Sequence, residues 1–327
     1  MSWTTLLLEA LGVAVLVWLL LRYRKSRAPL EAQLVAVGRG QISYLRGGRK
    51  GPTVVLLHGF AADKEHWLPL LPLLEKHDYQ VIVPDLPGFG ANFREADASY
   101  DAPALARQLR GFARAADLGM FHLVGHSIGA TLAASYAYAF PVEVASLTLI
   151  EPLGLTSPSQ SDLDRLLAQK RNPFLVGSVA AYDALLAFTT VKPPPMPSSL
   201  KKKRAETMAA DRAFYQTVWG SLVAGERAGL LDMLLPELKV RTLAVFGGAS
   251  RAVHPSTAKM LERRLEQHDS KVVSIPGAGH WLHLEKPQQL ADVLVTFFRA
   301  RPQPADERAA RRTRTGEVVA GGEPAPQ

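Results

Sequence analysis

The chain has 327 residues, of which 47% are hydrophobic and 21% charged, a composition typical of a globular protein and too apolar for a disordered one. It contains no cysteine, which excludes a disulfide scaffold, a cysteine nucleophile, an iron–sulfur cluster and any cysteine zinc site. The net charge of +8 gathers near the two ends, so the body lacks the basic stripe of a nucleic-acid binder and we expect no nucleic-acid partner.

The first thirty residues predict a membrane anchor. Residues 3–21 carry one charge, Glu9, and at about 1.5 Å per residue they span roughly 28 Å, close to the hydrocarbon thickness of a bilayer. Four basic residues follow at once, whereas a signal peptide carries its positive charge before the apolar run. By the positive-inside rule, residues 1–30 are then predicted to be a single-pass anchor with the main domain in the cytoplasm; a buried helix or an atypical signal peptide remains the alternative.

Short apolar strands alternate with helices through the first half of the body. Residues 34–37 and 42–45 predict an antiparallel hairpin. Buried strands are expected at 53–57, 81–83, 121–124 and 146–150, with helices at 67–76, 103–118 and 128–140. Such alternation is typical of βαβ units, and it predicts an α/β fold with a mostly parallel, doubly wound sheet.

The strand pattern breaks over residues 155–238, where only helical and irregular patterns occur. It returns at 242–246 and 272–275, and a helix over 287–300 closes the fold. An insertion after a sheet strand lies at the carboxyl end of the strand, where open α/β sheets bind ligands. We therefore predict a core of residues 31–154 and 239–300, a helical cap or lid of residues 155–238, and a disordered tail of residues 301–327.

Gly125-His126-Ser127-Ile128-Gly129 is a G-x-S-x-G motif. A buried strand precedes it and a helix of small residues follows, the setting in which a serine is held on a strained turn. Gly125 and Gly129 suit positions where neighbouring backbone comes too close for a Cβ, and the amino end of the helix favours a negative oxygen. Ser127 is therefore the predicted nucleophile, with His126 supporting the motif.

A serine nucleophile needs a base within hydrogen-bond reach. His280 ends a glycine-rich loop after the strand at 272–275, from which it can lean over the strand ends toward Ser127. The other histidines receive lesser roles: we interpret His58, His126, His254 and His283 as structural, and His66, His77, His122 and His268 as surface or element-end residues.

His58-Gly59-Phe60 ends the strand at 53–57. A glycine there permits a tight turn that leaves the next amide free. The backbone amides of Phe60 and Ile128 could then form an oxyanion hole. A plain strand-to-helix turn is the alternative interpretation.

These segments together resemble the α/β-hydrolase superfamily. The sequences HGF, PDLPGFG, VGHSIG, VFGG and GAGHWLHLEKP follow one another in order over about residues 41–298. The anchor and the opening HGFAADKEHW are most similar to membrane-anchored monoacylglycerol lipases and related esterases. The resemblance implies the chain order Ser…acid…His, a lipid-like or other ester as substrate, no metal, no cofactor and no obligate protein partner.

One departure from that pattern concerns the acid. In most relatives it follows the seventh strand in a segment resembling W-G-x-x-D-x-x-x-P, and here Ser250 occupies the place of the aspartate. Serine cannot carry the charge that stabilises imidazolium. Glu151 ends the strand at 146–150, where some relatives, including a subset of haloalkane dehalogenases, carry their acid. We predict that it replaces the missing aspartate; a salt bridge to the insertion, a solvated strand end, or Asp85 as the acid remain alternatives.

The sequence therefore predicts a serine ester hydrolase that works through an acyl-enzyme. Two alternatives keep the fold: a catalytically eroded ligand-binding protein, for which the missing acid at position 250 is the support, and another triad-dependent hydrolase such as a C–C bond hydrolase. Dehalogenases and epoxide hydrolases use a carboxylate nucleophile, which Ser127 cannot supply.

Overall fold

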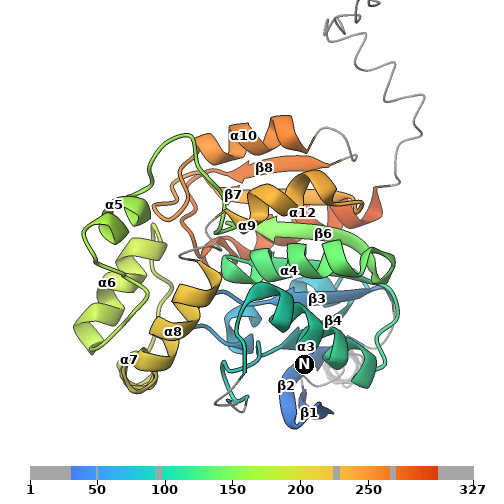
Figure 1. Cartoon of the computed structure of the whole chain (residues 1–327), viewed down its shortest axis with the longest axis horizontal. Helices are drawn as coiled ribbons and strands as arrows, with labels where there is room; N and C mark the ends of the chain where they lie inside the picture. Colours follow the sequence, from blue (N-terminus) through green and yellow to red (C-terminus); the bar gives the residue numbers. More distant parts are fainter. Residues whose placement is uncertain are drawn as a thin grey trace, which may run out of the picture.

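One eight-stranded sheet organises the part of the chain that the structure describes (Figure 1). The structure is a computed structural model that describes residues 31–48, 51–92, 94, 98–223, 229–265 and 270–300. The strands are β1 (Glu31–Val37), β2 (Gly40–Gly47), β3 (Thr53–Leu57), β4 (Gln80–Pro84), β5 (Phe121–His126), β6 (Val144–Ile150), β7 (Thr242–Gly247) and β8 (Lys271–Ile275). Their order across the sheet is β1-β2-β4-β3-β5-β6-β7-β8.

The sheet is parallel except at one edge. β1 pairs antiparallel with β2, and β2 pairs antiparallel with β4, whereas every other neighbouring pair is parallel. The predicted hairpin and the predicted mostly parallel sheet are thus confirmed. Every residue of β7 is buried, as a central strand with helices on both faces requires.

Helices cover both faces of the sheet. α3 (Ala102–Ala115) and α4 (Ile128–Ala139) pack in one hydrophobic core, together with α10 (Ser256–Arg264) beside β8. α2 (Leu71–Glu75), α11 (Leu282–Glu285) and α12 (Pro287–Arg299) pack in the other. The amphipathic spacing explains the docking of α3, since Leu105, Leu109 and Phe112 recur on one side of the helix and are all buried.

The segment between β6 and β7 is helical, as predicted. It holds α5 (Asp162–Ala168), α6 (Val179–Thr189), α7 (Ser198–Ala210), α8 (Arg212–Leu222), α9 (Leu230–Leu234) and the 3-10 helix η4 (Leu235–Glu237). Figure 1 shows α5 to α8 grouped beyond one end of the sheet. We call residues 155–238 the insertion.

One predicted helix is wrong, and two predicted terminal segments lie outside the described residues. The single helix predicted over 67–76 is wrong: the structure has a 3-10 helix, η1 (Lys64–Trp67), and then α2, which carries Pro72 in its first turn, because a proline inside a helix removes an N–H donor. The predicted anchor in residues 1–30 and the predicted tail in residues 301–327 lie outside the described residues. Within the described ranges, no helix is both long enough and apolar enough to cross a bilayer.

Candidate active site

Ser127 stands at the sharp turn between β5 and α4. Its backbone has φ +58° and ψ −120°, a conformation that side-chain-bearing residues rarely adopt. The Ser127 amide donates to the Ile150 carbonyl at 2.9 Å, and its carbonyl accepts from the Ala130 amide at 3.0 Å. The strained residue is therefore held from both sides, by β6 and by the first turn of α4.

The two motif glycines make this turn possible. A Cβ on Gly125 would lie 2.1 Å from the carbonyl oxygen of Gly129, and a Cβ on Gly129 would lie 2.4 Å from the carbonyl oxygen of His58. Real Cβ atoms do not approach backbone oxygens so closely. A side chain at Gly125 would force β5 away from α4, and a side chain at Gly129 would force the end of β3 away from α4.

His280 and Glu151 meet in the interior. His280 Nδ1 lies 2.9 Å from Glu151 Oε2, and both side chains are fully buried. Glu151 is the first residue after β6 and has a positive φ of +49°. Its carboxylate thus faces the histidine loop that follows β8, and not the insertion or the solvent.

Two further donors reach the Glu151 carboxylate. The Gly247 amide donates to Oε1 at 2.7 Å, and the Ser250 hydroxyl donates to Oε2 at 2.5 Å. Ser250 occupies the place expected of the acid and supplies a proton donor to the carboxylate that the neighbouring strand carries. Sequence reasoning missed this role, although the register that singled out position 250 was the available signal.

Burial sets the protonation of the pair. Burial raises the pKa of the Glu151 carboxyl, while the hydrogen bonds from Ser250 and Gly247 act in the opposite direction and favour the carboxylate. Burial lowers the pKa of His280, so the imidazole is neutral near pH 7. With Nδ1–H directed at Glu151, Nε2 is the nitrogen left with its lone pair.

The atoms that chemistry would use have no partners within the described chain. Ser127 Oγ and His280 Nε2 are both buried, and neither makes a hydrogen bond there. Buried polar atoms normally have hydrogen-bond partners, so these two atoms without partners, one on the turn after β5 and one on the loop after β8, mark a site prepared for a reacting group. An alcohol, a neutral imidazole and a buried carboxylate are the set needed to activate a serine.

The turn after β3 brings Phe60 to the same place. His58 Nε2 accepts the Leu86 amide at 2.9 Å, which makes Nδ1 the protonated nitrogen that donates to the Gly59 carbonyl at 2.8 Å. Neither the Phe60 amide nor the Ile128 amide donates to another described residue. Two amides are therefore available to an oxyanion.

Two further buried histidines, His126 and His66, lie close to the site and contact the loop of His280 and the insertion, respectively. His126 Nε2 donates to the carbonyl oxygen of His280 at 2.9 Å, which fixes the histidine loop from behind. The surface position expected for His66 is wrong. His66 is buried, packs edge-on against Trp281 and lies 3.0 Å from an Arg204 nitrogen, because α7 of the insertion covers η1.

Glu285 joins the insertion to the histidine loop. Its Oε2 accepts the Gly279 amide at 2.7 Å, and its Oε1 accepts the amides of Val191 and Lys192 at 2.7 and 2.9 Å. One carboxylate thus connects the residue before His280 to the chain just after α6. The sequence offered one signal for it, an acid five residues after His280.

The comparisons with known proteins agree with this geometry. The profile of the Alpha/beta hydrolase family matches residues 54–293. Lipase 1 of Psychrobacter immobilis is 25% identical over 284 residues, covering 85% of this chain and 87% of that protein. Monoacylglycerol lipase ABHD6 of Bos taurus is 26% identical over 269 residues, 79% of each chain. The crystal structure of a membrane phospholipase A shares 33% identity, with a TM-score of 0.78 over 90% of this chain and 96% of that one.

Proposed function

The chain belongs to the alpha/beta hydrolase family, and we propose that it is a serine ester hydrolase acting on lipids, with Ser127, His280 and Glu151 as its catalytic triad. The buried hydrogen bond between His280 Nδ1 and Glu151 Oε2, beside a serine on a strained turn, is the observation that carries this proposal. The similarity to two lipases and to a phospholipase A supports the lipid substrate.

The proposed reaction has two halves. Ser127 Oγ attacks the ester carbonyl while His280 Nε2 takes its proton, and the amides of Phe60 and Ile128 donate to the oxyanion. The imidazolium, stabilised by the Glu151 carboxylate, then protonates the departing alcohol and leaves an acyl group on Ser127. Water attacks the acyl-enzyme with His280 again as base, which releases the fatty acid and restores Ser127.

One cavity of the structure suits the acyl chain of the substrate, because leucine and valine side chains form part of its lining. A cavity of about 250 Å³ borders Leu153, whose amide donates to the Ser127 carbonyl at 3.4 Å. Leu155, Leu163, Leu167 and Val253 line it as well, beside polar side chains that include Asp164 and His254. We assign this cavity to the acyl chain and the insertion to a cap that shields the acyl group from water.

The anchor belongs to the same proposal. An apolar stretch over residues 3–21 followed by a basic flank would hold the enzyme at the inner face of a membrane, where lipid esters partition. Full-length protein should therefore sediment with membranes after cell lysis and resist extraction by high salt. Recovery of intact protein in the soluble fraction would contradict the anchor and leave the hydrolase assignment untouched.

A fluorophosphonate probe tests the hydrolase assignment directly, since it reacts with activated serines. We expect the wild-type protein to be labelled and Ser127→Ala to lose labelling together with about 10⁴-fold or more of kcat on a medium-chain monoacylglycerol. Ser199→Ala, at an exposed position of α7, is the control for specific labelling. Equal labelling of wild type and Ser127→Ala would rule out Ser127 as the nucleophile.

A further inference from the structure

The turn after β3, whose Phe60 amide is assigned to the oxyanion hole, is not held in place by its own hydrogen bonds. None of the backbone amides of residues 59–63 donates a hydrogen bond to another described residue. Ala61, in the middle of the turn, has a φ of +51°, a left-handed conformation that costs free energy for a residue with a side chain. We call residues 59–63 the oxyanion turn. Its position therefore depends on contacts with the elements on either side of it.

On the core side, the chain is fixed just before and just after this turn. His58 Nε2 accepts the Leu86 amide at 2.9 Å. The buried Asp85 carboxylate accepts the Lys64 amide at 2.8 Å and the Lys64 ammonium at 2.6 Å. Two successive residues after β4 thus hold the chain at both ends of the oxyanion turn, and the residues between these ends depend on other contacts.

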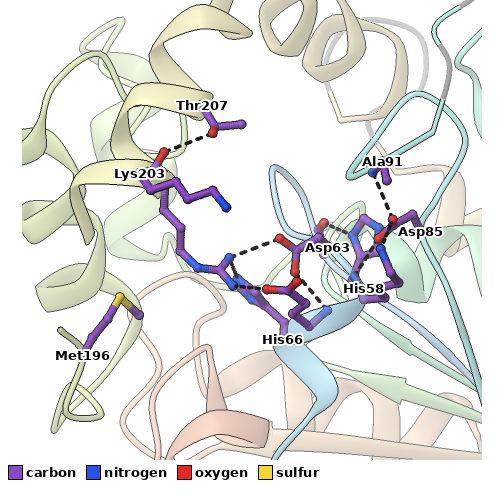
Figure 2. Close-up of polar contacts among 12 residues, drawn as sticks. His58, Asp63, His66, Asp85, Ala91, Met196, Lys203 and Thr207 are labelled. Carbon is purple, nitrogen blue, oxygen red and sulfur yellow. Dashed lines mark hydrogen bonds and ion pairs between the residues drawn. The ribbon is translucent and has the colours of Figure 1, made fainter. Parts of the chain in front are cut away.

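On the other side, α7 of the insertion reaches the turn through Arg204. Its guanidinium lies 3.3 Å from Asp63 Oδ2, 3.4 Å from Glu65 Oε2 and 3.0 Å from His66 Nε2. Asp63 Oδ1 accepts the Glu65 amide at 2.9 Å, which ties the same carboxylate to the start of η1. Figure 2 shows Asp63 and His66 between α7 and the core residue His58. One side chain of the insertion therefore holds the last residue of the oxyanion turn.

The ring of Phe60 also packs mainly against the insertion. Its centroid lies 5.0 Å from that of Trp219, 5.6 Å from that of Tyr215 and 6.4 Å from that of Phe174, which all belong to the insertion. Within the described residues, Phe89 at 6.2 Å is its one aromatic neighbour from the core. Aromatic pairs are favourable only in particular orientations, so these rings restrict where Phe60 can lie.

The position of the Phe60 amide matters because an oxyanion hole works through geometry. A donor must lie about 3 Å from the place that the charged oxygen will occupy, and removal of one such donor costs roughly 10²–10³ in kcat. The carbonyl oxygen of the bound ester carries less charge than the oxyanion. A shift of the oxyanion turn would therefore lower kcat more than it changes KM.

We propose that Arg204 is a positioning residue for the oxyanion hole: it holds the oxyanion turn so that the Phe60 amide faces the reacting oxygen while α7 and α8 lie against the core. The inference rests on the proposed ester hydrolysis at Ser127. It makes the insertion part of the catalytic geometry, because the oxyanion hole is complete only when the insertion contacts this turn.

The test compares two inhibitors of similar shape on the detergent-solubilised full-length protein. Ser127 Oγ adds to the carbonyl of 1,1,1-trifluorododecan-2-one, its proton passes to His280, and the carbonyl oxygen becomes an oxyanion, whereas 1,1,1-trifluorododecan-2-ol cannot react. We expect Arg204→Met to raise Ki of the ketone about tenfold and to lower kcat on a medium-chain monoacylglycerol about tenfold. Ki of the alcohol and KM should stay within twofold of wild type. Because inhibition constants do not depend on the amount of folded enzyme, partial unfolding cannot produce this pattern.

A double-mutant cycle tests the contact through which Arg204 acts. Asp63→Asn retains an oxygen that can cap η1 but removes the charge that faces Arg204, and it should also lower kcat. The kcat of the double variant should be close to that of the lower single variant, because two changes at one contact are not additive. Arg204→Lys keeps a charged donor and should recover part of kcat. Arg212→Met, at an exposed position of α8, is the matched control and should equal the wild type.

An Arg204→Met enzyme with kcat and ketone Ki both within twofold of wild type overturns the proposal, as do additive losses of kcat in the cycle. An equal rise in both inhibition constants also overturns it, since Arg204 would then shape the binding pocket and not the oxyanion hole. A different result marks failure of the proposed function: if the wild type hydrolyses no ester and binds the ketone no more tightly than the alcohol, the proposed ester hydrolysis itself is wrong.

Discussion

Three donors converge on the two carboxylate oxygens of Glu151. They come from the His280 imidazole, the Ser250 hydroxyl and the Gly247 amide, at 2.9, 2.5 and 2.7 Å. Hydrogen bonds to the ionised form offset the cost of burying the charge. The negative charge is then fixed beside the one imidazole that must become positive during the proposed reaction.

Replacing Glu151 by Gln keeps the shape, removes the charge and can present an amide donor to Nδ1, which selects the wrong tautomer. We expect kcat for a monoacylglycerol to fall by about 10² to 10⁴, by analogy with the aspartate of serine proteases. Glu262→Gln, at an exposed position of α10, is the control for the change of residue type. A folded Glu151→Gln enzyme with wild-type kcat would favour a Ser–His dyad.

The same geometry predicts a rescue. Because the Ser250 hydroxyl already contacts Glu151 Oε2, an aspartate at 250 places its carboxylate within reach of His280 when Glu151 is Gln. Ser250→Asp should therefore restore part of the kcat lost in Glu151→Gln. In the wild-type background it should lower kcat, because two carboxylates would share one buried site.

The position of a candidate site residue was predictable where a local motif marked it, or where the usual position for its role carries an unsuitable side chain. Ser127 followed from its turn, and Glu151 followed because position 250 carries no charge. The burial of His66 and the hydrogen bond of Ser250 were not predictable, since each depends on a segment distant in sequence. Arg204 reaches His66 across 138 positions, and Ser250 reaches Glu151 across 99.

Among the elements, the end of α6 and the histidine loop behave as one unit. Glu285 binds the amides on both sides, and the Trp281 amide adds a bond to the Thr189 carbonyl at 2.9 Å. This end of the insertion therefore cannot lift without disturbing the residues around His280. If the insertion opens as the proposed cap, the movement has to come from other helices, such as α7 and α8, which ion pairs hold to the core.

Glu285→Gln replaces a charged acceptor of three amides by a carboxamide with one acceptor oxygen. We expect kcat to fall about tenfold with a smaller change in KM, because the geometry of His280 is affected more than substrate binding. Hydrogen exchange of the Val191 and Lys192 amides should accelerate in parallel. Equal kcat together with faster exchange would show that Glu285 only secures the insertion.

The strands of the core were more predictable than the contacts between the core and the insertion. Runs such as TVVLL and TLAVFG are too short and too β-branched for helices, and each became a buried strand. The packing of the insertion was not predictable, because its aromatic contacts with the core, such as those of Tyr215 and Trp219 with Phe60, and its ion pairs join residues far apart in the sequence. Pro69 and Pro72 are the local signal that residues 67–76 do not form one helix.

For the molecule as a whole, buried histidines predict sensitivity to acid. His58, His66, His126, His280 and His283 are buried, and burial lowers the pKa of each. A histidine with a lowered folded-state pKa stabilises the fold above the unfolded pKa of about 6.5, and that stability is lost as the pH falls toward the folded pKa. Each contributes a slope of up to about 1.4 kcal/mol per pH unit, and the raised pKa of Glu151 opposes one of them.

We therefore expect the free energy of unfolding of the full-length protein to drop steeply between pH 6.5 and about pH 5, measured by urea titration in detergent at several pH values. His283→Gln should make the dependence shallower by about one proton, even where it lowers the stability at pH 7.5. His77→Gln, a partly exposed position, is the control. Equal stability at pH 7.5 and pH 5.5 would contradict the prediction.

The register of β5 against β6 has a consequence for biosynthesis. His126 pairs with Ile150, so Ser127 and Glu151, the proposed nucleophile and acid, each follow one partner of this pair directly, and both precede the insertion. His280, the proposed base, lies 129 residues after Glu151, on the loop that follows the last strand. A nascent chain, or one truncated between residues 151 and 279, holds Ser127 and Glu151 but lacks His280, the proposed proton acceptor. On the proposed mechanism, such incomplete copies would therefore be inactive as hydrolases.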